Sequence, residues 1–382
     1  MTPDQLLADA TAATGLDDLG PDRDVALAGL SAYVEACAAE ADLSELGVMA
    51  VHGALVGALS NRLKVVEHHR QHPDLRDAPV VAPVVVVGLF RAGTTLLSNL
   101  FDRDPANRAM LRWESQDSVP PPAPDELRSG PRVEAGQVGV DMLAAINPGI
   151  KAIHHEDADS PTECIAVLGQ AFQSISWEAL ANVPSYADWW RSSDMTAGYR
   201  FHKSVLQVLQ SNGCAGRWTL KSPGHALALD ALTAVYPDAR LVVLHRDPVV
   251  LTASVCSLIA TMSGAFSDVD HRAYIKDHWT DTLADCITAV DERADRMVHV
   301  QYADLVTQPI PTMERLYADL GMEPGPGAFD AMADELARHP QGSFGAHRYD
   351  LASYGLIEGE LRERFAGYVE KYDVPHEVPA HA

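Results

Sequence analysis

The sequence predicts an α/β fold in which a parallel β-sheet is flanked by helices. The run from Val84 to Val87 has four β-branched residues in succession, which is typical of a strand buried on both faces of a parallel sheet. Further apolar runs alternate with helical segments along the chain, and this alternation indicates parallel strands joined by right-handed crossovers. A glycine-bounded turn at residues 88–93 joins the first strand to a helix. The 382 residues, 47% of them hydrophobic, suffice for a sizeable core.

Composition and charge narrow the classes of partner and compartment. The formal net charge of −24 argues against nucleic-acid and anionic-membrane partners, because both attract basic surfaces. It also makes each basic residue in a motif informative, since an anionic ligand needs the few cations gathered where it binds. The five cysteines are scattered without a C-x-x-C pair, so we expect neither a disulfide framework nor a zinc site. We expect no signal peptide and no membrane-spanning run, which predicts a cytoplasmic protein.

Residues 1–78 are predicted to form a helical N-terminal extension, and residues 79–382 the main domain. Apolar residues of the extension recur at helical spacing in two stripes: Leu27, Leu30, Val34 and Cys37, and then Val48, Val51, Leu55 and Leu59. The segment from Asp42 to Glu45 supplies capping residues for the second helix. We expect the extension to pack on the main domain.

The turn after the first strand has the features of an anion site. Glycines let the backbone approach an oxyanion without a Cβ in the way, and the helix opened by Thr94 and Thr95 points its positive dipole end at the same place. The spacing matches the phosphate loop of nucleotide triphosphatases, except that Thr94 replaces their lysine and the cation is Arg91 inside the turn. This pattern favours a phosphate-type anion held by arginine and hydroxyl groups over a triphosphate with magnesium. The alternative is an ordinary glycine turn between a core strand and a helix.

Residues 105–215 are predicted to be a mainly helical region that contains a surface loop at the prolines of residues 120–124. Helices are expected at residues 138–146, 163–180 and 198–210. The turn before the second of these contains His154, His155 and several carboxylates. A metal site is one interpretation, but adjacent histidines do not face one point on a helix. The segment from Ser160 to Glu163 has the pattern of a helix cap.

Three further strands are expected in the second half of the chain, each followed by a helix. They begin at Arg217, Arg240 and Met297. Arg246 ends the second of them, and Ser254 lies in the second turn of the helix that follows. An arginine and a hydroxyl group placed in this way can share one phosphate. The alternative for Arg246 is an ion pair with Asp247.

The turn and a later segment together resemble one enzyme family. The turn is similar to the 5′-phosphosulfate loop of sulfotransferases that use 3′-phosphoadenosine 5′-phosphosulfate (PAPS), with the pattern Gly88-x-x-Arg91-x-Gly93-Thr94-Thr95-x-Leu97. The later segment, Lys221-Ser222-Pro223-Gly224-His225, resembles the Lys-Ser-Pro-x-His segment of the broad bacterial sulfotransferase group. The resemblance implies a P-loop NTPase-like sulfotransferase fold, in which residues 105–215 are a helical insertion on the acceptor side.

The resemblance also implies a site for the sulfuryl donor. The residues of the turn that would hold its 5′-phosphosulfate are Arg91, Ala92, Gly93, Thr94 and Thr95. Arg246 and Ser254 stand at the separation found in the family's 3′-phosphate site, and Tyr302, in a Tyr-x-Asp-Leu segment, matches the tyrosine that lies against adenine. The late loop that closes over the adenosine bisphosphate corresponds to His347, Arg348 and Tyr349. This loop lacks the Arg-Lys-Gly run of the better-known cytosolic enzymes.

The implied reaction transfers a sulfuryl group from PAPS to a hydroxyl group and releases adenosine 3′,5′-bisphosphate, with no metal. Positioning and charge neutralisation should supply most of the catalysis, with Arg91 at the phosphosulfate and Lys221 at the bridging oxygen. A general base must accept the proton of the acceptor hydroxyl. The candidates, in order of preference, are His225, then Glu163, then the pair His154 and His155. His225 is preferred because imidazole titrates near neutral pH.

Two other classes of function stay open. A P-loop kinase acting on a small molecule would need ATP and magnesium, and the missing lysine after the second glycine argues against it. A non-catalytic nucleotide-binding protein would keep the loop without the base. The expected partner is a small-molecule hydroxyl acceptor, with no nucleic acid and no membrane span; the oligomeric state is left open, with a homodimer as one option. Aromatic residues at 163–210 suggest a partly apolar alcohol as acceptor: Trp177, Trp189, Trp190 and Phe201.

Overall fold

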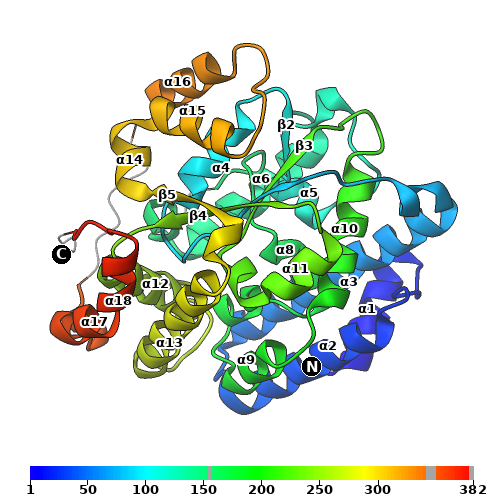
Figure 1. Ribbon diagram of the computed structural model, residues 1–382. Coiled ribbons are helices and arrows are strands. Elements are labelled where there is room, and N and C mark those ends of the chain that lie inside the picture. Colours follow the sequence, from blue (N-terminus) through cyan, green and yellow to red (C-terminus); the bar gives the residue numbers. More distant parts are fainter. Residues whose placement is uncertain (154–155, 341–349, 378–382) are drawn as a thin grey trace.

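The computed structural model describes residues 1–153, 156–340 and 350–377, and its centre is a parallel β-sheet (Figure 1). The strand order is β2-β3-β1-β4-β5, and every pair of neighbours is parallel. The strands are β1 Val84–Val86, β2 Asn107–Ala109, β3 Arg217–Lys221, β4 Arg240–His245 and β5 Met297–Gln301. The predicted α/β fold with a parallel sheet is therefore confirmed. The sequence did not indicate β2, because Asn-Arg-Ala lacks the β-branched residues that mark the other strands.

The middle of the sheet brings three chain segments to one edge. β1 lies between β3 and β4, and Val86 pairs with Lys221 on one side and with Val242 on the other. β2 and β3 lie on one side of β1, and β4 and β5 lie on the other. The order of the strands therefore reverses at β1, which makes this the switch point of the topology. Ligands of open α/β sheets bind at the carboxyl ends of the strands at such a point. The predicted anion-binding turn follows β1 at this edge.

Three long helices precede the sheet: α1 Pro3–Thr14, α2 Arg23–Glu40 and α3 Glu45–Gln71. The Ser44 side chain caps α3 by accepting from the Gly47 N–H at 3.1 Å, so the capping signal there is confirmed. Both predicted stripes face the core except at Val48, which is exposed; Leu27 is half-buried and packs against the core.

Within the described ranges, α3 alone is long and apolar enough by composition to cross a membrane. The core helix of a soluble protein meets the same criterion, and α3 carries buried polar residues with partners elsewhere in the fold. The Arg62 guanidinium donates to the carbonyl oxygens of Leu19 and Gln170, at 2.9 and 3.3 Å. These contacts tie α3 to the rest of the fold.

The remaining helices surround the sheet (Figure 1). Those before β3 are α4 Thr94–Asp102, α5 Arg112–Gln116, α6 Pro131–Ile146, α7 Ile150–Ile153, α8 Ile165–Leu168, α9 Pro184–Arg191 and α10 Thr196–Leu209. Those after β3 are α11 Leu229–Val235, α12 Pro248–Ser263, α13 Arg272–Asp291, α14 Tyr302–Thr307, α15 Pro309–Asp319, α16 Ala328–Arg338, α17 Glu358–Arg364 and α18 Ala366–Lys371. Short 3₁₀ turns connect several of them. In Figure 1, α17 and α18 (red) lie beside α12 and α13.

The helix predicted over residues 163–180 is wrong, because the chain there forms α8 and two 3₁₀ turns, at Gly169–Ala171 and Ile175–Ala179. Phe172 has a left-handed backbone with φ of 55°, which ends the helical path. The Ser174 and Ser176 hydroxyls then donate to the Ile165 carbonyl oxygen, at 2.9 and 3.3 Å. Serine side chains that bond nearby backbone groups compete with regular helix, and the apolar pattern does not reveal this.

One continuous hydrophobic core runs from Leu6 in α1 to Val374 beyond α18, and it includes the buried strands. The N-terminal helices therefore belong to the same core as the sheet, where α2 packs on α9 and α3 packs on α10. The division into an extension of residues 1–78 and a domain of residues 79–382 stays a prediction.

Candidate active site

The turn between β1 and α4 is tightly packed around its glycines. A Cβ added to Gly88 would overlap the Thr94 methyl group. Gly93, which precedes α4, has φ of 96°, and a Cβ there would lie 2.6 Å from a ring carbon of Tyr302. The two glycines are thus required by close approach and by backbone conformation. They leave the first N–H groups of α4 at the edge of the sheet, where an anion is stabilised.

Lys221 closes one side of this turn. It is the last residue of β3 and is 1% exposed. Its Nζ donates to Thr95 Oγ1 at 3.2 Å, and it lies 3.6 Å from Glu163 Oε1, whose side chain is 17% exposed. A buried ammonium group is thereby held between a hydroxyl at the start of α4 and a carboxylate.

Arg91 connects the turn to two helices. Its backbone is left-handed, with φ of 67°. Its Nε donates to Ser254 Oγ of α12 at 3.1 Å, and its Nη2 donates to the carbonyl oxygen of Ile153, at the end of α7, at 2.7 Å. The structure therefore brings the predicted residues Arg91 and Ser254 together, although they are far apart in the sequence.

Arg246 lies directly behind Arg91, at the carboxyl end of β4. Its Nη1 donates to the Arg91 carbonyl oxygen at 3.1 Å, and its guanidinium carbon stands 4.0 Å from the centre of the Tyr302 ring. Its Nε and Nη2 both donate to the Glu377 carboxylate, at 2.8 Å each. The alternative partner of Arg246, Asp247, is instead bonded to Arg362. Arg91, Ser254, Arg246 and Tyr302 thus form one connected group.

The two described base candidates have different surroundings. The backbone N–H next to Glu163, that of Cys164, donates to the Lys221 carbonyl oxygen at 2.9 Å, which fixes the acid beside the lysine. His225 is buried, and its Nδ1 lies 2.7 Å from the Tyr199 hydroxyl. Burial, with a smaller effect of nearby His202, lowers the pKa of His225 to about 3, so the imidazole is neutral at physiological pH. Within the described ranges, its Nε2 has no hydrogen-bond partner.

Some of the predicted site residues lie outside the described residues: His154, His155, His347, Arg348 and Tyr349.

The aromatic residues proposed for the acceptor side are mostly part of the core. Trp177, Trp190 and Phe201 are buried, and the Trp190 indole donates to Glu178 at 2.6 Å. These three side chains are therefore packing residues and give no information about an acceptor.

Sequence reasoning missed two contributors to the site. Glu377 approaches Arg246 from the C-terminal segment, and the Ile153 carbonyl approaches Arg91 from α7. Neither residue belongs to a motif, so no sequence signal could have identified them. In the described part of the chain, no group of three or more potential ligands is arranged around a metal position.

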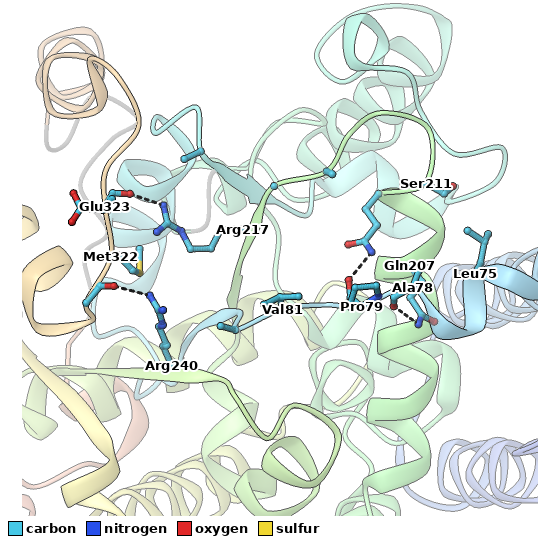
Figure 2. A pocket seen from close by; sticks show the side chains of 16 residues that line it. Leu75, Ala78, Pro79, Val81, Gln207, Ser211, Arg217, Arg240, Met322 and Glu323 are labelled. Carbon is cyan, nitrogen blue, oxygen red and sulfur yellow. Dashed lines mark hydrogen bonds between the residues drawn. The ribbon is translucent and has the colours of Figure 1, made fainter.

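A separate cavity of about 750 Å³ lies at the opposite edge of the sheet (Figure 2). It is lined by Arg217 and Arg240, which begin β3 and β4, and by the segment from Gly321 to Glu323. Figure 2 shows both arginines directed at that segment, where they donate to the carbonyl oxygens of Glu323 and Gly321 at 3.1 and 3.3 Å. This cavity is open, and its arginines bind backbone, so we place the candidate active site at the β1–α4 turn.

Comparisons with known proteins agree on one family. The model of a family described as the sulfotransferase family matches residues 83–325. Omega-hydroxy-beta-dihydromenaquinone-9 sulfotransferase Stf3 of Mycobacterium bovis and of Mycobacterium tuberculosis is 23% identical over 310 residues, which is 75% of this chain and 75% of theirs.

Two solved structures match along nearly the whole chain. Sulfotransferase STF1 from Mycobacterium tuberculosis H37Rv is 35% identical, with a TM-score of 0.85, and the match covers 96% of this chain and 99% of that one. Sulfotransferase STF9 from Mycobacterium avium is 30% identical, with a TM-score of 0.89 and coverage of 100% and 98%. The similarity therefore includes the N-terminal helices as well as the sheet.

Proposed function

This chain belongs to the sulfotransferase family, and we propose that it transfers a sulfuryl group from PAPS to a hydroxyl group of a small, partly apolar acceptor. The observation that carries the proposal is the convergence of Arg91, Lys221 and Arg246 on the glycine turn at the switch point of the sheet. In a chain of net charge −24, three cations around one helix start are a site for an anionic ligand.

The residues of this site fit the two ends of PAPS. Arg91, Gly93, Thr94 and Thr95 would hold the 5′-phosphosulfate, since they surround the start of α4, where backbone N–H groups and the helix dipole favour an anion. Arg246 and Ser254 would hold the 3′-phosphate, and Tyr302, under the Arg246 guanidinium, would contact the adenine. PAPS supplies an activated sulfuryl group when bound. Lys221 would neutralise charge on the bridging oxygen, and its contact with Thr95 supports this role.

We propose Glu163 rather than His225 as the general base. The Glu163 carboxylate is partly exposed and lies beside Lys221, so an acceptor hydroxyl could reach it at the turn. His225 is enclosed, and with a pKa of about 3 its imidazole has little affinity for a proton at pH 7. In this assignment the acceptor oxygen would attack sulfur while its proton moves to the Glu163 carboxylate, and the bond from sulfur to the bridging oxygen would break to release adenosine 3′,5′-bisphosphate.

The base assignment is tested with Glu163→Gln and His225→Gln, each assayed for turnover and for binding of adenosine 3′,5′-bisphosphate. Glu163→Gln should lose roughly 100-fold or more in turnover while its affinity for the bisphosphate stays close to that of the wild type. His225→Gln, which keeps a hydrogen-bonding group towards Tyr199, should retain most of its turnover. The opposite ranking of the two variants would return the role to His225.

The donor is tested by calorimetry with adenosine 3′,5′-bisphosphate and with ATP, each with and without magnesium. The bisphosphate should bind without metal, and ATP poorly, because ATP lacks the 3′-phosphate. Arg91→Ala and Arg246→Ala should each weaken bisphosphate binding by about 1.5–3 kcal/mol, the range for hydrogen bonds to charged groups. Arg70→Ala, on the exposed face of α3, is the matched control and should change nothing. Preferential binding of ATP with magnesium would instead identify a kinase.

The acceptor and the cellular setting are proposals of the same kind. The curated relatives are named for a hydroxylated menaquinone, which supports an apolar alcohol as the acceptor class. Turnover with a panel of hydroxylated lipids, sterols and polyketides would separate an enzyme from a protein that only binds nucleotide. We further propose a cytoplasmic protein without a nucleic-acid partner, in keeping with its acidic charge.

A further inference from the structure

The C-terminal segment returns to the candidate donor site. Beyond α18, the chain packs Val374 into the core and then reaches Arg246 with Glu377. Figure 1 shows this segment, in red, turning back beyond α18. The Glu377 carboxylate accepts two hydrogen bonds from Arg246, from Nε and from Nη2, both at 2.8 Å. This paired geometry is the one by which arginine binds carboxylates and phosphates.

Several further contacts hold Glu377 in this position. Its backbone N–H donates to Asp247 Oδ2 at 2.8 Å, and the Asp247 carboxylate also caps α12 through the Val249 N–H at 3.0 Å. Arg362 of α17 donates to the same Asp247 oxygen at 3.2 Å and to the Glu377 carbonyl oxygen at 3.4 Å. The buried Asp247, which follows Arg246 in the chain, thus anchors the backbone of Glu377. The carboxylate is placed by the fold rather than by its ion pair alone.

The ion pair between Glu377 and Arg246 occupies the side of the guanidinium that a phosphate would use. Its Nη1 is bonded to the Arg91 carbonyl, so the Nε–Nη2 edge is the one that offers two parallel donors, and Glu377 lies on that edge. A phosphate that takes the same edge must displace the carboxylate, and one that binds beside it meets a like charge. We propose that Glu377 is an autoinhibitory residue, which occupies the 3′-phosphate position on Arg246 and leaves it when the donor binds. This inference rests on the proposed function.

The proposal makes Glu377 a competitor of the ligand. The donor then binds only those molecules in which the carboxylate has left Arg246, so its apparent affinity is lowered in proportion to their fraction. Removal of the carboxylate should therefore raise the affinity for the donor. If Glu377 instead stayed in place and oriented Arg246 for the ligand, its removal would lower the affinity. The two roles therefore predict effects of opposite sign in the same measurement.

The test is calorimetric titration of the full-length protein with adenosine 3′,5′-bisphosphate and, separately, with adenosine 5′-monophosphate, which lacks the 3′-phosphate. The variants are Glu377→Ala and Glu377→Gln, with Glu370→Ala on the exposed face of α18 as the matched control. Glu377→Ala should bind the bisphosphate at least about threefold more tightly than the wild type. Glu377→Gln should follow in the same direction, because the amide keeps an acceptor but loses the charge. Neither variant should change the affinity for the monophosphate.

Two results would overturn the proposal and differ from each other. Unchanged or weaker bisphosphate binding by both folded Glu377 variants would remove the autoinhibitory role and leave the proposed function intact. Failure of the wild type and of every variant to bind the bisphosphate would remove the proposed function, and this inference with it. Binding by the two Glu377 variants and not by the wild type would support both.

Discussion

Replacement of Gly93 by alanine tests the geometry of the turn on which the candidate site is built. Gly93 has φ of 96°, where a residue with a side chain is strained by about 1–3 kcal/mol. The added Cβ would lie 2.6 and 2.7 Å from two carbons of the Tyr302 ring. Moving the ring costs about another 1–3 kcal/mol, the usual range for overpacking. We therefore expect Gly93→Ala to lower the free energy of unfolding by about 2–6 kcal/mol.

The size of the chain sets the corresponding change in melting temperature. An unfolding entropy of about 2.1 cal/mol/K per residue gives roughly 0.8 kcal/mol/K for the whole chain, so the midpoint should fall by about 2.5–7.5 °C. Gly57→Ala is the matched control, since Gly57 lies in α3 with no atom within 4 Å of the added Cβ. Alanine is the better helix former there, and the control should raise the midpoint by about 1 °C.

Scanning calorimetry measures both variants, and titration with adenosine 3′,5′-bisphosphate provides the second readout. Because the Arg246 guanidinium stands on the Tyr302 ring, displacement of the ring by Gly93→Ala should also weaken binding. The control should bind as the wild type does. A melting temperature of Gly93→Ala at or above that of the wild type would show that neither the left-handed backbone nor the ring contact constrains this position.

Two further predictions concern stability. Burial lowers the pKa of His202, His225 and His245 to about 3, below the ordinary 6.5, so below about pH 6.5 the unfolded chain binds protons that the folded chain does not. The free energy of unfolding, measured in urea, should therefore fall as the pH drops below about 6.5, by about 2 kcal/mol for each histidine at pH 5. A profile that is flat between pH 7 and pH 5 would contradict this. Breaking the buried ion pair of Arg108 and Glu114 should destabilise the fold more than replacing both residues. In the same assay, Glu114→Gln should lower the free energy of unfolding by about 3–5 kcal/mol, and the double variant Arg108→Met with Glu114→Leu should lower it by less. A double variant less stable than Glu114→Gln would contradict this.

The sequence predicted best what depends on short stretches of chain. The apolar run before Gly88 and the hydroxyl residues after Gly93 define a strand, a turn and a helix start within fourteen residues, and the structure has all three. Lys221 and Arg246 could be placed at strand ends because each follows an apolar run. Parallel strands put their carboxyl ends at one edge, so the gathering of these cations followed from topology.

What the sequence could not provide depends on contacts between distant segments. The direction of His225 is set by a buried bond to Tyr199, and the preference for Glu163 arises from its contact with Lys221. The break at Phe172 comes from serine hydroxyls that bond back to α8, which the helical period does not encode. Glu377 lies near the end of the chain, and only the packing of the final segment brings it to the site.

The single core that runs from Leu6 to Val374 has a consequence for how the chain folds during its synthesis. At about 5–20 residues per second, the last residue of α10 is added roughly 7–28 s after the end of α3. During that interval the apolar faces of the first three helices are not yet covered by α9 and α10, and aggregation or capture by a chaperone competes with folding. Substitutions that expose or weaken these helices should therefore reduce the yield of protein in the cell more than the activity of the molecules that complete their fold.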